Sequence, residues 1–211
     1  MKRSLAALIF FLCLGGAKAQ HAGSVSLNVY GGYAFQDRVN LDNLRGYVNG
    51  AFEYGGGLEY FLQRKTSVEL SYQRQDTHLP LYGADGEHLN SGRDKGSVNF
   101  ILIAGTDYFE NNSQPNTVPY AGAGVGLGVV SIKDGNTATK FAWNARLGVK
   151  IKTSSVVSLN LQAYIQSIIS PVGNDFYLTA GGTVIAVTDY ASLFQFGLGA
   201  VLSFNFKSKT K

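Results

Sequence analysis

The chain has 211 residues, a length suited to one domain, and 45% of them are hydrophobic. Its net charge of +4 comes from the two ends, because the segment 20–206 has slightly more acidic than basic side chains. That balance excludes a basic nucleic-acid-binding surface, and we expect no nucleic-acid partner. The single cysteine, Cys13, lies in the N-terminal leader, which excludes a disulfide framework and thiolate metal sites from the rest of the chain.

Residues 1–19 have the features of a secretory signal peptide. Lys2 and Arg3 form a positive start, an apolar run follows, and Ala17-Lys18-Ala19 makes a small-residue cleavage site. The apolar run, residues 5–14, is too short to cross a bilayer as a helix, which needs about 20 residues. We therefore predict that this leader directs export and is removed.

Eight segments of the remaining chain alternate apolar and polar side chains with a period of two, which is the pattern of a β-strand with two unlike faces. In the last segment every even position from Phe194 to Phe206 is apolar, and the odd positions are small or polar except Val201. The eight segments are residues 24–35, 50–62, 66–74, 97–109, 118–132, 140–153, 156–167 and 192–206.

The fourth segment matches the pattern least well, because Ile101 and Ile103 fall on the face that we assign as polar. Its predicted apolar face carries Val98, Phe100, Leu102, Ala104 and Tyr108, and its predicted polar face carries Asn99, Ile101, Ile103, Gly105 and Asp107.

The connections between these segments alternate in length. Residues 63–65, 110–117 and 154–155 form short connections, whereas residues 36–49, 75–96 and 168–191 form long ones. Only residues 133–139 break the contrast, since a compact turn stands where a long loop is expected. Short periplasmic turns and long extracellular loops, on an even number of strands, predict an all-β fold: an eight-stranded antiparallel up-and-down transmembrane β-barrel.

The last long connection contains a second strand-like pattern. Residues 177–187 have β-forming side chains on both sides of Gly181 and Gly182, which favours a hairpin with a tight turn. We interpret the hairpin as an extension of the last two strands above the membrane. A ten-stranded barrel is the alternative interpretation.

The apolar face is assigned to lipid, with aromatic girdles near both strand ends. The predicted girdle consists of Tyr33, Phe35, Phe52, Tyr60, Tyr108, Phe141, Trp143, Phe194, Phe204 and Phe206. The polar face is rich in glycine and carries charges of both signs. An eight-stranded barrel has an interior that side chains can fill, so we predict a lumen filled by an ion-paired network. Its predicted members are Glu53, Glu59, Glu69, Arg74, Asp107, Arg146 and Lys150. The alternative is a soluble barrel on which these charges are solvated.

With these strands in place, the chain resembles the outer-membrane protein β-barrel domain family, small barrels of the OmpA/OmpX type. The resemblance rests on Gly55-Gly56-Gly57-Leu58-Glu59-Tyr60, on Pro119-Tyr120-Ala121-Gly122-Ala123-Gly124-Val125-Gly126, and on a closing strand that ends in Phe206. It implies the bacterial outer membrane as location, outer-membrane lipid as surroundings, and an assembly machinery that reads the terminal aromatic residue. We therefore divide the chain into a signal peptide at 1–19, an outer-membrane β-barrel at 20–206, and a short basic periplasmic tail at 207–211.

One loop contains residue types that serve in hydrolases. His78 and His88 share it with acidic and hydroxyl side chains, namely Asp76, Asp85, Glu87, Ser91 and Asp94. Nucleophilic catalysis needs a base held by an orienting group on a rigid frame, and a loop rich in glycine and aspartate gives no sign of such a frame. The spacing of Asp85 and Glu87 matches no calcium loop. We therefore predict no enzyme, no cofactor and no metal site.

The sequence favours an integral outer-membrane barrel with a structural or surface-interaction role through its three long loops, without naming an extracellular partner. A narrow channel for small solutes is the first alternative. A hydrolase at the barrel rim and a soluble periplasmic ligand-binding barrel are the others.

Overall fold

The computed structural model describes residues 22–41, 44–110, 116–133, 137–154, 156–169, 176–180, 183–187 and 192–206. The predicted signal peptide at 1–19 and the predicted tail at 207–211 lie outside these residues. Among the described residues, no helix is long and apolar enough to cross a membrane.

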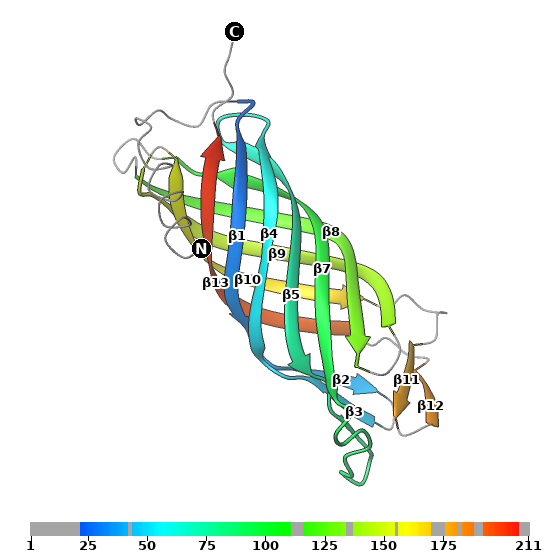
Figure 1. The fold of residues 1–211 in the computed structure, drawn as a ribbon. Helices are drawn as coiled ribbons and strands as arrows, with labels where there is room; N and C mark the ends of the chain where they lie inside the picture. The colour runs from blue at the N-terminus through cyan, green and yellow to red at the C-terminus, as the bar shows by residue number, and fades with distance from the viewer. Residues whose placement is uncertain are drawn as a thin grey trace, which may run out of the picture.

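Eight antiparallel strands form a closed barrel in the order β1-β13-β10-β9-β8-β7-β5-β4 (Figure 1). The strands are β1 (Val25–Ala34), β4 (Ala51–Phe61), β5 (Thr66–His78), β7 (Lys95–Tyr108), β8 (Thr117–Ile132), β9 (Thr137–Lys152), β10 (Val157–Ile169) and β13 (Ser192–Phe206). The first and last strands pair along their length, from Val25 opposite Phe206 to Ala34 opposite Gly197. The predicted eight-stranded antiparallel barrel is confirmed.

The outer surface of the barrel is apolar and its interior is largely polar. Outward-facing Leu58, Ile103 and Leu147 are 57%, 60% and 66% exposed, whereas inward-facing Ser26 and Gln195 are fully buried. Removing apolar surface from water stabilises a protein by about 25 cal/mol per Å², and this outer face would gain none of that stabilisation in water. A barrel with this arrangement is stable only where lipid covers its outer face.

Five further strands lie at one end of the barrel, which we call the long-loop end (Figure 1). A three-stranded sheet joins β2 (Asp37–Leu41), β3 (Leu44–Val48) and β6 (Leu81–Tyr82), and a two-stranded sheet joins β11 (Phe176–Ala180) and β12 (Thr183–Val187). The predicted long loops at 36–49 and 75–96 are therefore partly β-structure.

The predicted hairpin near the C-terminus is present, since β11 and β12 pair antiparallel from Phe176 opposite Val187 to Ala180 opposite Thr183. Its predicted turn residues, Gly181 and Gly182, lie outside the described residues. The hairpin is a separate sheet, so the interpretation as an extension of the last two barrel strands is wrong. The ten-stranded alternative is also wrong. Each arm of the hairpin has five residues, whereas a strand that crosses the membrane needs about 9–11.

Strand β7 has the opposite orientation to the one predicted. Val98, Phe100 and Leu102 are buried inside the barrel, and Ile101 and Ile103 face outward. Both faces of β7 are apolar, so a period of two does not choose between them. Pairing makes the choice, because residues directly opposite one another in antiparallel strands share a face, and a shift of one residue would exchange the faces.

The partners of β7 explain its orientation. Outward-facing Leu70 of β5 lies opposite Ile103. On the inner face, Phe100 lies opposite Gly128 and Leu102 opposite Gly126 on β8. A Cβ atom at Gly128 would lie 2.5 Å from Cδ1 of Ile168. The glycine therefore leaves the space that packed apolar side chains occupy inside the barrel.

The other end of the barrel, which we call the short-turn end, carries a small ionic cluster. Glu110 forms ion pairs with Arg64 at 3.0 Å and with Lys152 at 3.1 Å. Partial burial raises the pKa of Glu110. The hydrogen bond and charge of Lys152, with the charge of Arg64, outweigh that effect, so the pKa lies below its ordinary value.

This cluster predicts a small acid-dependent loss of stability. A group whose pKa is lowered on folding contributes stability above its unfolded pKa, which is about 4.3 for glutamate. That contribution is lost as the pH falls through the lower folded-state pKa. We expect Glu110→Gln to destabilise the barrel by less than about 1 kcal/mol at pH 7, since Arg64 is largely exposed. Denaturant unfolding at pH 7 and at pH 3 checks this. A difference between the two proteins that persists undiminished at pH 3 would contradict it.

Candidate functional site

The centre of the barrel lumen is organised around the carboxylate of Glu69 on β5. Arg146 of β9 approaches it at 2.7 Å, and both side chains are almost completely buried. Asn28 donates a hydrogen bond to Glu69 at 2.6 Å, and the Tyr30 hydroxyl donates another. Arg146 also donates to the Thr106 hydroxyl at 2.8 Å. The network thus joins β1, β5, β7 and β9 across the lumen.

A second carboxylate, Glu59 on β4, lies next to this network. It accepts hydrogen bonds from Ser67 at 2.5 Å and from Tyr108 at 2.6 Å. Asn28 also donates to it at 3.3 Å and so connects the two carboxylates. Buried charges are tolerated only where hydrogen bonds and opposite charges replace their hydration. Glu69 has both kinds of partner, and Glu59 is held by three hydrogen bonds.

The third buried carboxylate belongs to Glu53, which lies nearer the long-loop end. It accepts a hydrogen bond from Gln166 of β10 at 2.7 Å. Both side chains are buried, so this bond ties β4 to β10 across the lumen.

Lys150 is the second buried cation of the lumen. Its amine lies 4.9 Å from the ring centre of Tyr108 and 5.2 Å from that of Phe61. Among the described residues it has no hydrogen-bond partner. Aromatic faces attract a cation more strongly where water is excluded, which accounts for its position between the two rings.

Apolar clusters lie in the lumen on both sides of the charged network. At the short-turn end the cluster consists of Phe61, Tyr108, Val118 and Tyr120. At the long-loop end it consists of Val48, Val98, Phe100, Leu102, Ala142, Ile168 and Leu193.

Five of the seven predicted lumen charges lie inside the barrel, each less than a tenth exposed: Glu53, Glu59, Glu69, Arg146 and Lys150. The other two predictions are wrong. The side chain of Arg74 is 39% exposed on the outer wall, where it pairs with Asp76 at 2.6 Å. Arg74 has the same parity as outward-facing Leu70 and Tyr72 on β5, so the alternation already indicated its direction. Asp107 lies outside because β7 faces the opposite way, and it accepts a hydrogen bond from Thr66 at 2.7 Å.

Most predicted girdle residues lie on the outer wall. Those that are exposed are Tyr33, Phe35, Phe52, Tyr60, Phe141, Phe194 and Phe206. Trp143 and Phe204 are half-buried, and Trp143 packs against Phe194 with ring centres 6.2 Å apart. Tyr108 is a wrong prediction, because it is buried in the lumen and donates to Glu59. A role of the outward set as a membrane girdle stays a prediction.

Sequence reasoning missed the uncharged partners that hold the network together: Asn28, Tyr30, Ser67, Thr106 and Gln166. The alternation of inward- and outward-facing positions along each strand indicated the inward direction of most of these side chains. Asn28 and Tyr30 alternate with outward-facing Leu27 and Val29, and Ser67 shares the face of Glu69.

The loop with two histidines does not assemble a catalytic arrangement in the described part of the chain. Nδ1 of His78 lies 3.1 Å from Oδ2 of Asp94, while His88 stacks on Tyr82 with ring centres 4.9 Å apart. Within the described ranges, Ser91 makes no hydrogen bond to either histidine, so neither is placed to activate it. Among the same residues no group of three His, Cys, Asp or Glu side chains could hold a metal ion.

Comparisons with known proteins agree with this architecture. A family model described as the outer membrane protein beta-barrel domain matches residues 4–204. OprG of Pseudomonas aeruginosa is 12% identical, with a TM-score of 0.67 over 90% of this chain and 99% of that one. The N-terminal β-barrel domain of OprF from the same organism is 16% identical, with a TM-score of 0.51 over 89% and 100%.

Neisserial surface protein A is 14% identical, with a TM-score of 0.54 over 86% of this chain and 97% of that one. Identities this low show a shared fold alone. No curated protein matches the chain in a sequence comparison. From the family match and the closed barrel, the chain belongs to the outer membrane protein β-barrel domain family and is a protein of the bacterial outer membrane.

Proposed function

We propose that this protein is an integral outer-membrane barrel whose lumen does not conduct and whose role is structural or interactive at the cell surface. The observation that carries the proposal of a closed lumen is the Glu69–Arg146 pair, buried between two apolar clusters. An ion crossing the lumen would lose its hydration at both clusters and would have to separate the buried pair between them. Each of these steps has a high free-energy cost.

The long-loop end supports the interactive part of the proposal, because short turns of such barrels face the periplasm and long loops face outward. The sheet of β2, β3 and β6 forms a defined surface there. It contains a cleft of about 430 Å³ whose lining includes Arg45, Tyr47 and Tyr82. Tyr47 and Tyr82 pack edge to face with ring centres 5.8 Å apart. Aromatic and arginine side chains are enriched at protein interaction sites.

Conductance measurements test the closed lumen. We expect the wild-type protein, reconstituted in a planar bilayer with salt on both sides, to carry no steady current above that of protein-free lipid. A reproducible single-channel current from correctly folded protein would contradict the proposal and favour the channel.

A narrow channel for small solutes is the second candidate, and one observation favours it. Among the described residues, several buried polar atoms on β9 and β10 have no protein partner: Oδ1 of Asn144, Oγ of Ser158, Oδ1 of Asn160 and Oε1 of Gln166. Buried polar atoms are ordinarily satisfied, often by ordered water. A current that falls when Asn160 is replaced by leucine would assign conduction to this side of the lumen.

The proposal includes no enzymatic activity. A rim hydrolase would need a nucleophile beside His78 or His88. Instead, His78 contacts Asp94 and His88 stacks on Tyr82. Equal lipase or protease activity in wild-type protein and in a His78→Ala, His88→Ala double variant would agree with this proposal.

A further inference from the structure

The outer wall changes from apolar to basic along three neighbouring strands near the long-loop end. Outward-facing residues of β5, β7 and β8 lie in rows because the strands are paired in register. The rows, taken toward the long-loop end, are Tyr72, Ile101 and Leu127; then Arg74, Asn99 and Val129; then Asp76, Ser97 and Ser131; and last His78, Lys95 and Lys133. The apolar part of the outer wall therefore gives way to polar residues, and the last row toward the long-loop end contains His78 and two lysines.

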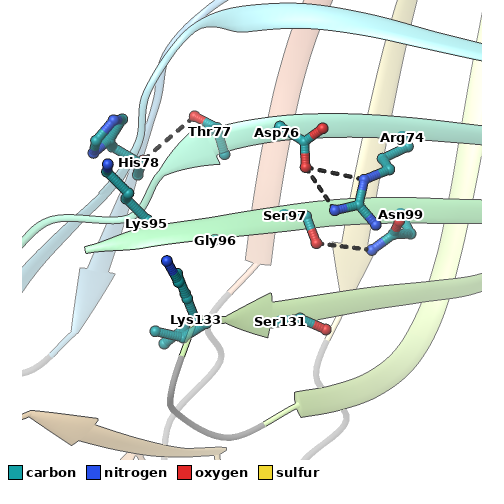
Figure 2. Close-up of a pocket in the computed structure, with 11 residues that line it drawn as sticks. Arg74, Asp76, Thr77, His78, Lys95, Gly96, Ser97, Asn99, Ser131 and Lys133 are labelled. Atoms are coloured by element: carbon teal, nitrogen blue, oxygen red, sulfur yellow. Dashed lines mark hydrogen bonds and ion pairs between the residues drawn. The ribbon is translucent and has the colours of Figure 1, made fainter. Parts of the chain in front are cut away.

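Polar residues of these rows line an open cleft of about 580 Å³, which we call the basic cleft. Figure 2 shows His78, Lys95 and Lys133 near the strand ends, with Arg74 and Asp76 further along the wall. Three of the lining side chains carry a permanent positive charge, whereas Asp76 is the one acidic side chain that lines the cleft.

The two lysines are the cations of the basic cleft that are available to a ligand. Arg74 is held by Asp76 through bonds of 3.0 and 2.6 Å, and His78 lies beside Asp94. Within the described residues, the amines of Lys95 and Lys133 take part in no hydrogen bond or ion pair. Their backbones are joined, since the amide of Lys133 donates to the carbonyl of Lys95 at 2.8 Å. The two side chains thus start from neighbouring backbone positions at the end of the cleft.

We propose that the basic cleft binds the phosphate groups of a phosphorylated glycolipid in the outer leaflet. The acyl chains would lie on the apolar row of Tyr72, Ile101 and Leu127, all three outward-facing and substantially exposed. The headgroup would then lie beside Arg74, and its outer part would lie beside Lys95 and Lys133, which are nearer the long-loop end. Anionic lipid headgroups are attracted to lysine and arginine at a membrane surface.

The height of the basic cleft decides between a glycolipid and a simple phospholipid. Arg74 and His78 are four positions apart on β5, which is roughly 14 Å along the strand and about 10 Å along the membrane normal at the usual tilt. A single phosphodiester has one anionic group and contacts the cleft at one height only. A headgroup built on sugar rings, with phosphates spread over that height, reaches Arg74 and both lysines together.

Binding of lipopolysaccharide to the purified full-length protein in detergent tests the proposal. We expect Lys95→Gln, Lys133→Gln to weaken binding by about fivefold per lysine, or roughly 25-fold for the pair, from the usual attraction of one lysine to an anionic surface. The same variant with arginine at both positions should bind like wild type. Raising the salt concentration should weaken wild-type binding, since exposed charges are screened.

The matched control is Arg64→Gln, Lys65→Gln, which removes the same charge at the short-turn end and should leave binding unchanged. Equal affinity in wild type and the Lys95, Lys133 variant would overturn the proposal, as would equal losses in both charge variants. Equally tight binding of lipopolysaccharide stripped of its phosphates would overturn it too. Inorganic phosphate binding as tightly as lipopolysaccharide would assign the cleft to a free anion instead.

Gel mobility without heating verifies that every variant is folded. This inference rests on the membrane location of the barrel and not on the state of its lumen. A failure here therefore leaves the conductance prediction unaffected.

Discussion

Replacing Arg146 with methionine is expected to destabilise the barrel by about 3–5 kcal/mol, because the change leaves Glu69 as an uncompensated buried carboxylate. Arg146 is its only ion-pair partner among the described residues, at 2.7 Å. The Tyr30 and Asn28 hydrogen bonds would remain, but they replace only part of the lost interaction. Urea unfolding of the protein in lipid vesicles measures the difference.

The chain offers a matched control for this prediction in Arg74. This arginine also pairs with a carboxylate at 2.6 Å, that of Asp76, but on the exposed outer wall. Arg74→Met should cost no more than about 1 kcal/mol, since exposed pairs contribute little. Equal losses in the Arg74 and Arg146 variants would contradict the assignment of the Glu69–Arg146 pair to a buried lumen.

A double variant separates the ion pair from the remaining packing. Glu69→Gln together with Arg146→Met removes both charges, so its cost should be smaller than the sum of the two single costs. Additive costs would mean that the two side chains do not interact in the folded barrel.

Replacing Phe100 with alanine is expected to destabilise the barrel by about 3–5 kcal/mol and to weaken the apolar cluster at the long-loop end. Phe100 is 1% exposed and lies in the cluster with Val98, Leu102 and Ile168. The opposite residue is Gly128, which has no side chain to fill the space left by the ring. The Glu69–Arg146 pair and the cluster at the short-turn end still obstruct the lumen, so we expect the variant to stay non-conducting. Urea unfolding in lipid vesicles measures the loss of stability.

Ile103→Ala is the control, since Ile103 lies on the same strand but faces outward. Lipid can fill the space, so no cavity forms, and the loss should stay below about 2 kcal/mol. It should also leave the conductance unchanged. If the Ile103 variant were the more damaging of the two, the orientation of β7 described above would be wrong.

The period-two pattern of the sequence is sufficient to predict the eight-stranded barrel. Seven of the eight barrel segments have one clearly apolar face, and long loops alternate with short turns. In lipid every backbone polar group must be paired, so an even set of such strands has a closed barrel as its stable arrangement. The same pattern also placed Glu53, Glu59 and Glu69 inside, because each alternates with outward-facing apolar residues.

Only the tertiary structure determines which face of β7 points inward and which side chains the lumen charges contact. The faces of β7 are both apolar, and only pairing with β5 and β8 turns Phe100 inward and Asp107 outward. The partners of each lumen charge were likewise undetermined, because Glu69 and Arg146 are distant in sequence and meet only when the barrel closes. A single strand specifies which side chains share a face. Register and closure specify which of those side chains touch, since those contacts are made between strands.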